Sequence, residues 1–177
     1  MNKQLSRQTN FISICSICKS KCCKGARPPL SSSRIQIIED YLLERGIVPR
    51  FDRREYSFPY EREDGYCSLL DVETGYCIVH EVKPETCVAG PITFDIDAGR
   101  GVIEWYLKTE DICLLAGVLA RNRMLLLEHL LSARREILHL VNELSSTELK
   151  AILRIEEEHT VKIGEECLPE LIVKKLI

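Results

Sequence analysis

The chain has 177 residues, of which 45% are hydrophobic and 29% are charged, and its formal net charge is −3. By size scaling it can bury roughly 70% of its unfolded surface, so it does not need a metal merely to fold. The glycines and prolines are too few for a fibrous or disordered protein. The slightly acidic balance argues against a nucleic-acid partner.

The sequence predicts neither a targeting segment nor a membrane anchor. Residues 1–11 are polar and lack the apolar stretch of a signal peptide. The longest apolar run, around Met124–Leu131, is too short to span a bilayer. We therefore expect a cytoplasmic protein that does not bind membranes. Nine cysteines in a reducing compartment favour metal or redox chemistry over disulfides, and their odd number points the same way.

The first predicted regular element follows a group of N-terminal cysteines. Pro28 and Pro29 end any regular structure there. Ser31–Ser33 then offers N-caps for a helix that stops before Gly46. The apolar face of this helix comprises Ile35, Ile38, Tyr41 and Leu42.

The next segment, Arg50–Leu107, reads as short runs separated by turn residues, which predicts small antiparallel hairpins. The clearest pair joins Pro91–Asp97 to Val102–Leu107, because both runs are rich in β-branched and aromatic residues around a glycine-containing loop. Before them, Lys83–Cys87 predicts one helical turn with Pro84 at its first position. The turn signals are Asp64-Gly65, Thr74-Gly75 and Asp97–Gly101.

From Thr109 onward the apolar residues recur with helical spacing, with a break expected at Ala120–Arg123. Ser145 and Glu148 form a capping box for a further helix that runs to about Glu157.

A last short helix begins at Pro169, and no strand is predicted after Leu107. The predicted fold class is therefore α+β. A small cysteine-rich, loop-rich metal-binding part with short antiparallel hairpins, residues 1–115, packs against a helical C-terminal extension, residues 116–177. The two parts can also form one compact domain.

The first cysteine motif is compact, with four cysteines close together in the chain. When two cysteines are separated by two residues, the chain can turn so that both thiolates bind one metal ion or cluster. A third cysteine shortly downstream can then bind the same metal ion or cluster. The motif consists of Cys15, Cys18, Cys22 and Cys23. Adjacent side chains usually point in divergent directions, so Cys22 and Cys23 are expected to bridge two sites.

A second set of cysteines follows at even spacing: Cys67, Cys77 and Cys87. Cys113 then lies in the first turn of a predicted helix, where amide dipoles favour a thiolate. The two groups together supply eight candidate cofactor and metal ligands, enough for two four-cysteine centres. Cys167 has no suitably spaced neighbour and is not expected to be a ligand. His80 is expected to hydrogen-bond near the site and not to bind the metal itself.

The order of these motifs resembles the YkgJ-like cysteine-cluster family, which is described as a zinc- or iron-chelating domain and as iron-sulfur-cluster-containing. The resemblance covers about residues 10–115 and implies a chelating domain without a settled reaction. It rests on three segments in order: Cys15-x2-Cys18-x3-Cys22-Cys23, Cys67-Ser-Leu-Leu, and Cys77-Ile-Val-His-Glu-Val-Lys-Pro-Glu-Thr-Cys87.

The chain departs from the family at three positions, because many members carry Tyr, Arg and Arg where this sequence has His80, Lys83 and Val88. Lysine keeps the charge of arginine but loses its bidentate fork. The resemblance therefore does not extend to an anion or substrate contact at Lys83.

Eight cysteines with almost no histidine exceed what one structural zinc ion needs, so an iron-sulfur cluster of the 4Fe-4S type is favoured and zinc is the alternative. The predicted function is a metal-binding protein with one or two centres for electron transfer, redox sensing, or service as the cluster-bearing partner of a larger enzyme. The alternatives are a zinc-binding structural or interaction module that docks a protein partner, and a metal-delivery protein. No catalytic residue is assigned, because Walker, dinucleotide-binding, metalloprotease and serine-hydrolase motifs are absent from the sequence.

Overall fold

The computed structural model describes residues 14, 17–18 and 20–176. These residues form helices and two small antiparallel sheets, which confirms the predicted α+β class. The elements in chain order are η1 (Lys21–Cys23), α2 (Ser32–Leu43), β1 (Phe51–Arg53), β2 (Ser57–Pro59), α3 (Glu85–Ala89), β3 (Ile92–Asp97), β4 (Val102–Lys108), α4 (Leu114–Ala120), α5 (Arg123–Glu143), α6 (Ser146–Ile152), β5 (Thr160–Cys167) and α7 (Glu170–Leu176).

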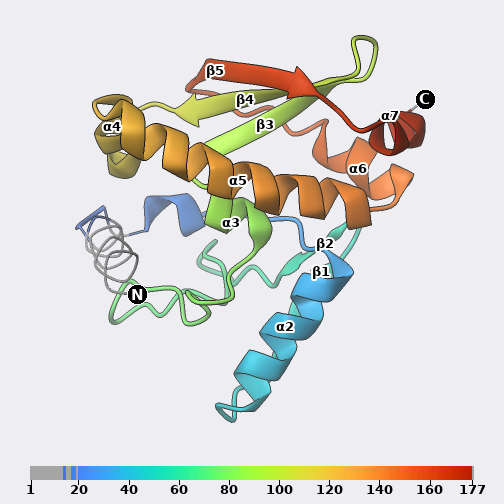
Figure 1. The fold of residues 1–177 in the computed structure, drawn as a ribbon. Coiled ribbons are helices and arrows are strands. Elements are labelled where there is room, and N and C mark those ends of the chain that lie inside the picture. The colour runs from blue at the N-terminus through green and yellow to red at the C-terminus, as the bar shows by residue number, and fades with distance from the viewer. Residues whose placement is uncertain (1–13, 15–16, 19, 177) are drawn as a thin grey trace, which may run out of the picture.

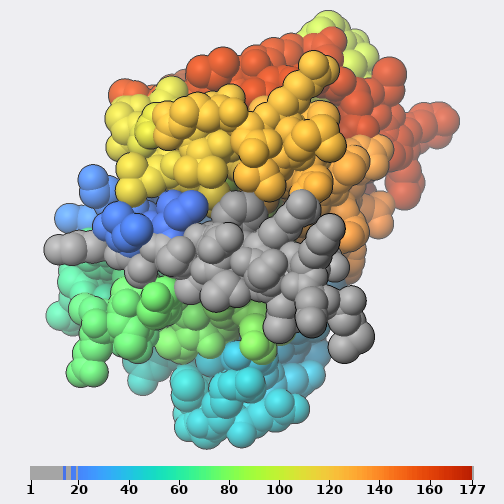
Figure 2. Space-filling view, turned by 60° about the vertical axis from the view of Figure 1, so that its left-hand side comes forward, coloured from blue at the N-terminus to red at the C-terminus, as the bar shows by residue number. Residues whose placement is uncertain are grey.

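The long helix α5 lies between the two halves of the molecule. The three-stranded sheet β3-β4-β5 runs along one side of α5, and α3 packs on its other side, with α2 extending beyond (Figure 1). In the space-filling view, the red C-terminal residues lie above the gold residues of α4 and α5, and the green and cyan residues of the first half lie below them (Figure 2). None of the helices in the described part of the chain is long and apolar enough to cross a membrane.

The helix predicted after the first cysteine motif is α2, and its caps are confirmed. The Ser31 side chain accepts a hydrogen bond from the backbone N–H of Arg34 at 3.1 Å. Gly46 follows the helix with φ 71°, a left-handed conformation that glycine adopts without strain. The buried face of α2 packs on the loops that carry the middle cysteines, and this smaller core comprises Leu30, Ile35, Ile38, Leu42, Cys67, Leu69 and Val79.

The predicted hairpin of residues 91–107 is also confirmed, as β3 and β4 pair in an antiparallel register that sets Ile92 opposite Leu107 and Asp97 opposite Val102. Alternate residues of β4 are buried, as expected for a sheet with one face on the core. Its inward residues Ile103, Trp105 and Leu107 face α5 and belong to the larger core.

Strand β5 is a correction to the sequence prediction. The helix expected to run to about Glu157 ends at Ile152, and the chain then returns along β4 as Thr160–Cys167. Half of the eight residues of β5 are polar or charged and none is buried, so this edge strand lacks a clear apolar pattern of its own. The strand conformation of β5 is instead stabilised by its pairing with β4.

The predicted break in the C-terminal helices is confirmed. Helix α4 ends at Ala120, and α5 begins at Arg123 with Asn122 as its N-cap, whose side chain accepts from the Leu125 N–H at 3.1 Å. The capping box of Ser145 and Glu148 is present at the start of α6. Buried residues of α4 to α7 complete the larger core with the sheet, among them Leu119, Ile137, Leu140, Leu149 and Ile172.

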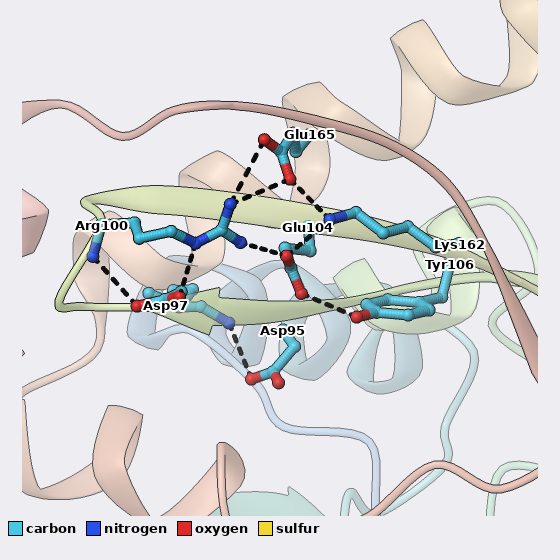
Figure 3. Close-up of polar contacts among 8 residues, drawn as sticks. Asp95, Asp97, Arg100, Glu104, Tyr106, Lys162 and Glu165 are labelled. Atoms are coloured by element: carbon cyan, nitrogen blue, oxygen red, sulfur yellow. Dashed lines mark hydrogen bonds and ion pairs between the residues drawn. The ribbon is translucent and has the colours of Figure 1, made fainter.

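The outer face of the three-stranded sheet carries a network of charged residues that pair within the chain (Figure 3). The Lys162 ammonium donates to Oε1 of Glu104 at 2.6 Å, and the Tyr106 hydroxyl donates to Oε2 at 2.7 Å. Arg100 also pairs with Glu104 and bonds Asp97 at 2.7 Å. The hydrogen bond from Lys162, with that from Tyr106, lowers the pKa of Glu104 to about 2. These contacts link all three strands on the face away from α5.

Candidate metal centre

The structure describes seven of the eight cysteines predicted as ligands, while Cys15 lies outside the described residues. They come from five separate segments of the chain. Cys18 precedes η1, Cys22 and Cys23 lie in η1, Cys67 and Cys77 pair with Glu61 and Leu70 in isolated bridges, Cys87 lies in α3, and Cys113 is the N-cap of α4. Cys113 thus immediately precedes its helix and does not lie in the first turn.

Hydrogen bonds to main-chain carbonyl groups hold the first three segments together. The N–H of Cys67 donates to the carbonyl oxygen of Cys23 at 3.0 Å. The buried Ser20 hydroxyl donates to the carbonyl oxygen of Gly75 at 2.7 Å, and Gly75 lies in the turn before Cys77. One backbone and one side-chain hydrogen bond therefore fix the η1 loop against both turns of the middle segment.

Helix α3 carries Cys87, and α5 holds it in place. Pro84 occupies the N-cap of α3 and not the first helical position that the sequence predicted. The ring Nε2 of His129 lies 2.9 Å from the carbonyl oxygen of Ala89 and 3.0 Å from that of Gly90. Because these carbonyls end α3, a protonated Nε2 on His129 satisfies groups that a helix terminus leaves without an intrahelical partner.

A second link joins α2 to the turn before α3. Arg34 donates from Nη1 to the carbonyl oxygen of Lys83 at 2.9 Å, and its Nη2 pairs with Glu136 of α5. Both side chains of this ion pair are largely buried, at 15% and 16% exposure. Arg34 thus connects α2, the turn before Cys87 and α5.

Glu85, the first residue of α3, is fully buried. Its Oε1 accepts a hydrogen bond from Ser31, the N-cap of α2, while no described residue donates to its Oε2. Burial raises the pKa of the Glu85 carboxyl, which favours the neutral form. The contact ties the start of α2 to the turn that carries Cys87.

The thiols of the middle segments affect one another electrostatically. Burial raises the pKa of Cys87, and the charges of Cys77, Cys22 and Cys67 raise it further, against the opposing charge of Lys83. Burial likewise raises the pKa of Cys67 to about 11, with an added contribution from Cys77. Such mutual effects require the sulfurs to lie near one another.

The adjacent Cys22 and Cys23 thiols share a hydrogen bond with opposite effects on the two groups. It lowers the pKa of Cys22 and raises that of Cys23. Cys23 is also affected by the charges of Cys87 and Cys67.

The pKa of Cys113 is affected by two cysteines of the first motif. Burial raises its pKa, the backbone N–H groups of Ala116 and Leu115 lower it, and the charges of Cys22 and Cys18 raise it again. Cys22 thus affects Cys113 as well as Cys77 and Cys87 of the middle segments.

A broad cavity of about 1820 Å³ lies against these thiols. Its lining includes Cys22, Cys23, Cys67, Cys77, Cys87 and Cys113. Among residues 14, 17–18 and 20–176, no three or more His, Cys, Asp and Glu side chains form a ready-made metal-ion site. The thiols are gathered as neighbours, without closed coordination geometry.

Comparison with protein families identifies the domain. The family CxxCxxCC, described as "Putative zinc- or iron-chelating domain", matches residues 14–114. The chain belongs to this family. Searches of the curated proteins and of the solved structures found no match.

The CxxCxxCC match begins before Cys15 and ends after Cys113, so all eight predicted ligands lie inside it. Cys167 lies outside the match, exposed at the end of β5 and opposite Val102. The matched segment also includes β3 and β4, so the family domain comprises part of the sheet as well as the cysteine-bearing loops.

The donor set fits the metals named in the CxxCxxCC description. Thiolate is a soft ligand that suits zinc and iron-sulfur clusters, whereas magnesium and calcium take oxygen ligands. The described cysteines that act on one another are not in disulfides, and they comprise Cys22, Cys23, Cys67, Cys77, Cys87 and Cys113. No disulfide therefore prevents their sulfurs from binding a metal ion or cluster.

Several residues that position or surround these thiols could not be predicted from the sequence. Arg34, His129 and Lys108 lie far from the cysteine motifs in the sequence, and each reaches the region through tertiary packing. Nothing in their local sequence distinguishes them from other helix or strand residues. His80, which the sequence did identify, is half-buried and lines the cavity.

Proposed function

We propose that this CxxCxxCC protein holds one or two thiolate-ligated metal centres, with an iron-sulfur cluster of the 4Fe-4S type as the cofactor. Its role is electron transfer or redox sensing, by itself or as the cluster-bearing partner of a larger enzyme. The observation that supports this most strongly is that six cysteines from separate segments of one fold line the same cavity.

The pattern of electrostatic effects among the cysteines favours two ligand groups. Cys67 affects Cys23 and Cys87, and Cys77 affects Cys67 and Cys87, so these four cysteines can supply one group of thiolates. Cys113 responds to Cys22 and Cys18, and Cys15 precedes Cys18 by the spacing typical of a shared centre. Cys22 also affects Cys77 and Cys87, which supports a role for it at either group.

The number and chemistry of the donors favour iron-sulfur over zinc. Each four-iron cluster takes four cysteine thiolates, so two groups of four match two clusters. When bound, such a cluster supplies one-electron chemistry. The chain supplies the thiolates and their partial burial, which limits access of water and oxidants to the sulfurs.

Anaerobic purification followed by iron, acid-labile sulfide and zinc analysis tests the proposal. We expect brown protein with iron and sulfide in equal amounts, about four of each per chain for every 4Fe-4S centre, and a broad visible absorption that bleaches on reduction. Colourless protein that contains zinc alone would instead establish the zinc-binding structural or interaction module. Protein that takes up neither metal under these conditions would refute a metal centre altogether.

Metal delivery is a second candidate function, and the exposure of Cys22 favours it. A delivery protein needs at least one ligand that an acceptor can reach. Competition with a chelator tests this candidate: delivery predicts that part of the metal leaves rapidly, while a closed centre loses its metal slowly and as a unit.

A further inference from the structure

Lys83 lies beside the cysteines, and no sequence motif around it predicts a role there. It immediately precedes Pro84, the N-cap of α3, and is half-buried. With Cys22, Cys77 and Cys87 it lines the same cavity. The hydrogen bond from Arg34 to its carbonyl oxygen fixes the backbone from which its side chain extends.

The described part of the chain offers Lys83 no carboxylate within ion-pair distance. Lys108 provides the contrast, because it lines the same cavity but pairs with Glu157 at 2.8 Å. A half-buried ammonium without a counter-charge is unfavourable by itself. An anionic group in the cavity would compensate for it.

The cysteines are the neighbours of Lys83 in the cavity. Cys22, Cys77 and Cys87 all line the cavity with Lys83, and they come from both proposed ligand groups. Lys83 is therefore a cation that the two groups of thiolates can share.

We propose that Lys83 is a positioning residue whose ammonium balances the excess negative charge of the metal-thiolate centre. This inference rests on the proposed function. Four thiolates around Zn²⁺, or around an oxidised four-iron cluster, leave a net negative charge that a nearby cation stabilises. Lysine suits this role as a compact point charge, which needs no bidentate geometry.

The experiment uses the full-length reduced chain and Co²⁺ alone as the probe, because thiolate-bound Co²⁺ gives a charge-transfer absorption that reports sulfur coordination. We expect Lys83→Gln to weaken Co²⁺ binding about tenfold, equivalent to about one unit of thiol pKa or 1.4 kcal/mol. Lys83→Met should weaken binding to the same extent, whereas Lys83→Arg should bind Co²⁺ as tightly as the wild type. The matched control is Lys108→Gln, whose effect should be several times smaller because Glu157 already neutralises that lysine.

The outcomes separate this inference from the proposed function. If the wild-type chain gives no thiolate-to-cobalt absorption, the metal centre itself is refuted. If the wild type binds Co²⁺ and both Lys83→Gln and Lys83→Met bind equally well, the charge of Lys83 is unimportant and the inference fails. It also fails if Lys83→Arg is as weak as Lys83→Gln, because side-chain shape and not charge would then decide. Circular dichroism of each variant verifies its fold, and Lys83→Met replaces Lys83→Gln if the latter does not fold.

Discussion

The N–H of Cys67 donates a hydrogen bond to the carbonyl oxygen of Cys23, with 3.0 Å between the two atoms. This contact joins the first cysteine motif to the second through the main chain. Because both partners are backbone atoms, replacing either side chain leaves the hydrogen bond available. Cysteine-to-serine variants therefore test the sulfur chemistry without directly removing this tie.

Cys87→Ser should lower metal affinity by more than about tenfold, because it removes a ligand sulfur and not merely an outer contact. Cys87 receives charge effects from Cys77, Cys22 and Cys67, more cysteines than act on Cys67 or Cys77. Metal per chain and chelator competition provide the measurement. Cys167→Ser is the matched control, since Cys167 is exposed and lies outside the family match. Equal metal content in the two variants would contradict the ligand role of Cys87.

Cys113→Ser and Cys67→Ser distinguish one centre from two. Cys113 responds to Cys22 and Cys18, whereas Cys67 responds to Cys77. Two centres predict that each variant retains about half of the metal, as one of two four-cysteine sites survives in each. The double variant should then lose nearly all of it. A single shared centre predicts instead that either replacement alone removes most of the metal.

Arg34→Met should lower the free energy of unfolding by about 1–3 kcal/mol, because it leaves the buried Glu136 carboxylate and the Lys83 carbonyl without this donor. Arg135→Met is the control: Arg135 lies 3.7 Å from the same Glu136, but its side chain is 76% exposed. Urea unfolding followed by circular dichroism measures both variants. Similar losses from the two replacements would show that burial of the Arg34 pair contributes little.

Part of the fold and of the candidate site could be predicted from the sequence. Helix α2 and the β3-β4 hairpin were predictable because their signals are local: Ser31 precedes an apolar periodicity, and a glycine-containing loop separates two β-branched runs. The cysteine positions were equally visible, whereas the bridging of two sites by Cys22 and Cys23 stays a prediction.

Residues that act through tertiary packing were not predictable in this way. His129 reaches the end of α3 from α5, and Arg34 reaches Lys83 from α2, so neither contact follows from sequence spacing. Strand β5 was missed for a related reason, because its polar residues gain their strand conformation from pairing with β4. The local sequence after Ser145 instead favoured a longer helix than α6.

Glu104→Gln should make stability less dependent on pH in acid. The hydrogen bond from Lys162, with that from Tyr106, lowers the folded-state pKa of Glu104 to about 2 from an ordinary value of 4.5. Between these values the unfolded chain binds more protons than the folded chain, so the contribution of Glu104 is fully present above pH 4.5 and is lost as the pH falls towards 2. Glutamine cannot ionise, so the variant lacks this contribution at neutral pH.

Thermal unfolding of wild type, Glu104→Gln and Glu170→Gln across this acidic range provides the test. Glu170 is a suitable control because its side chain is 82% exposed and pairs only with Lys174 among the described residues. Any loss of metal in acid affects all three proteins, so the difference between their curves isolates the carboxylate. The wild-type and Glu104→Gln curves should converge as the pH falls, while the Glu170→Gln curve should follow the wild type throughout. Wild-type and Glu104→Gln curves that stay parallel down to pH 2 would show that the charged network on the outer face of the sheet does not stabilise the fold.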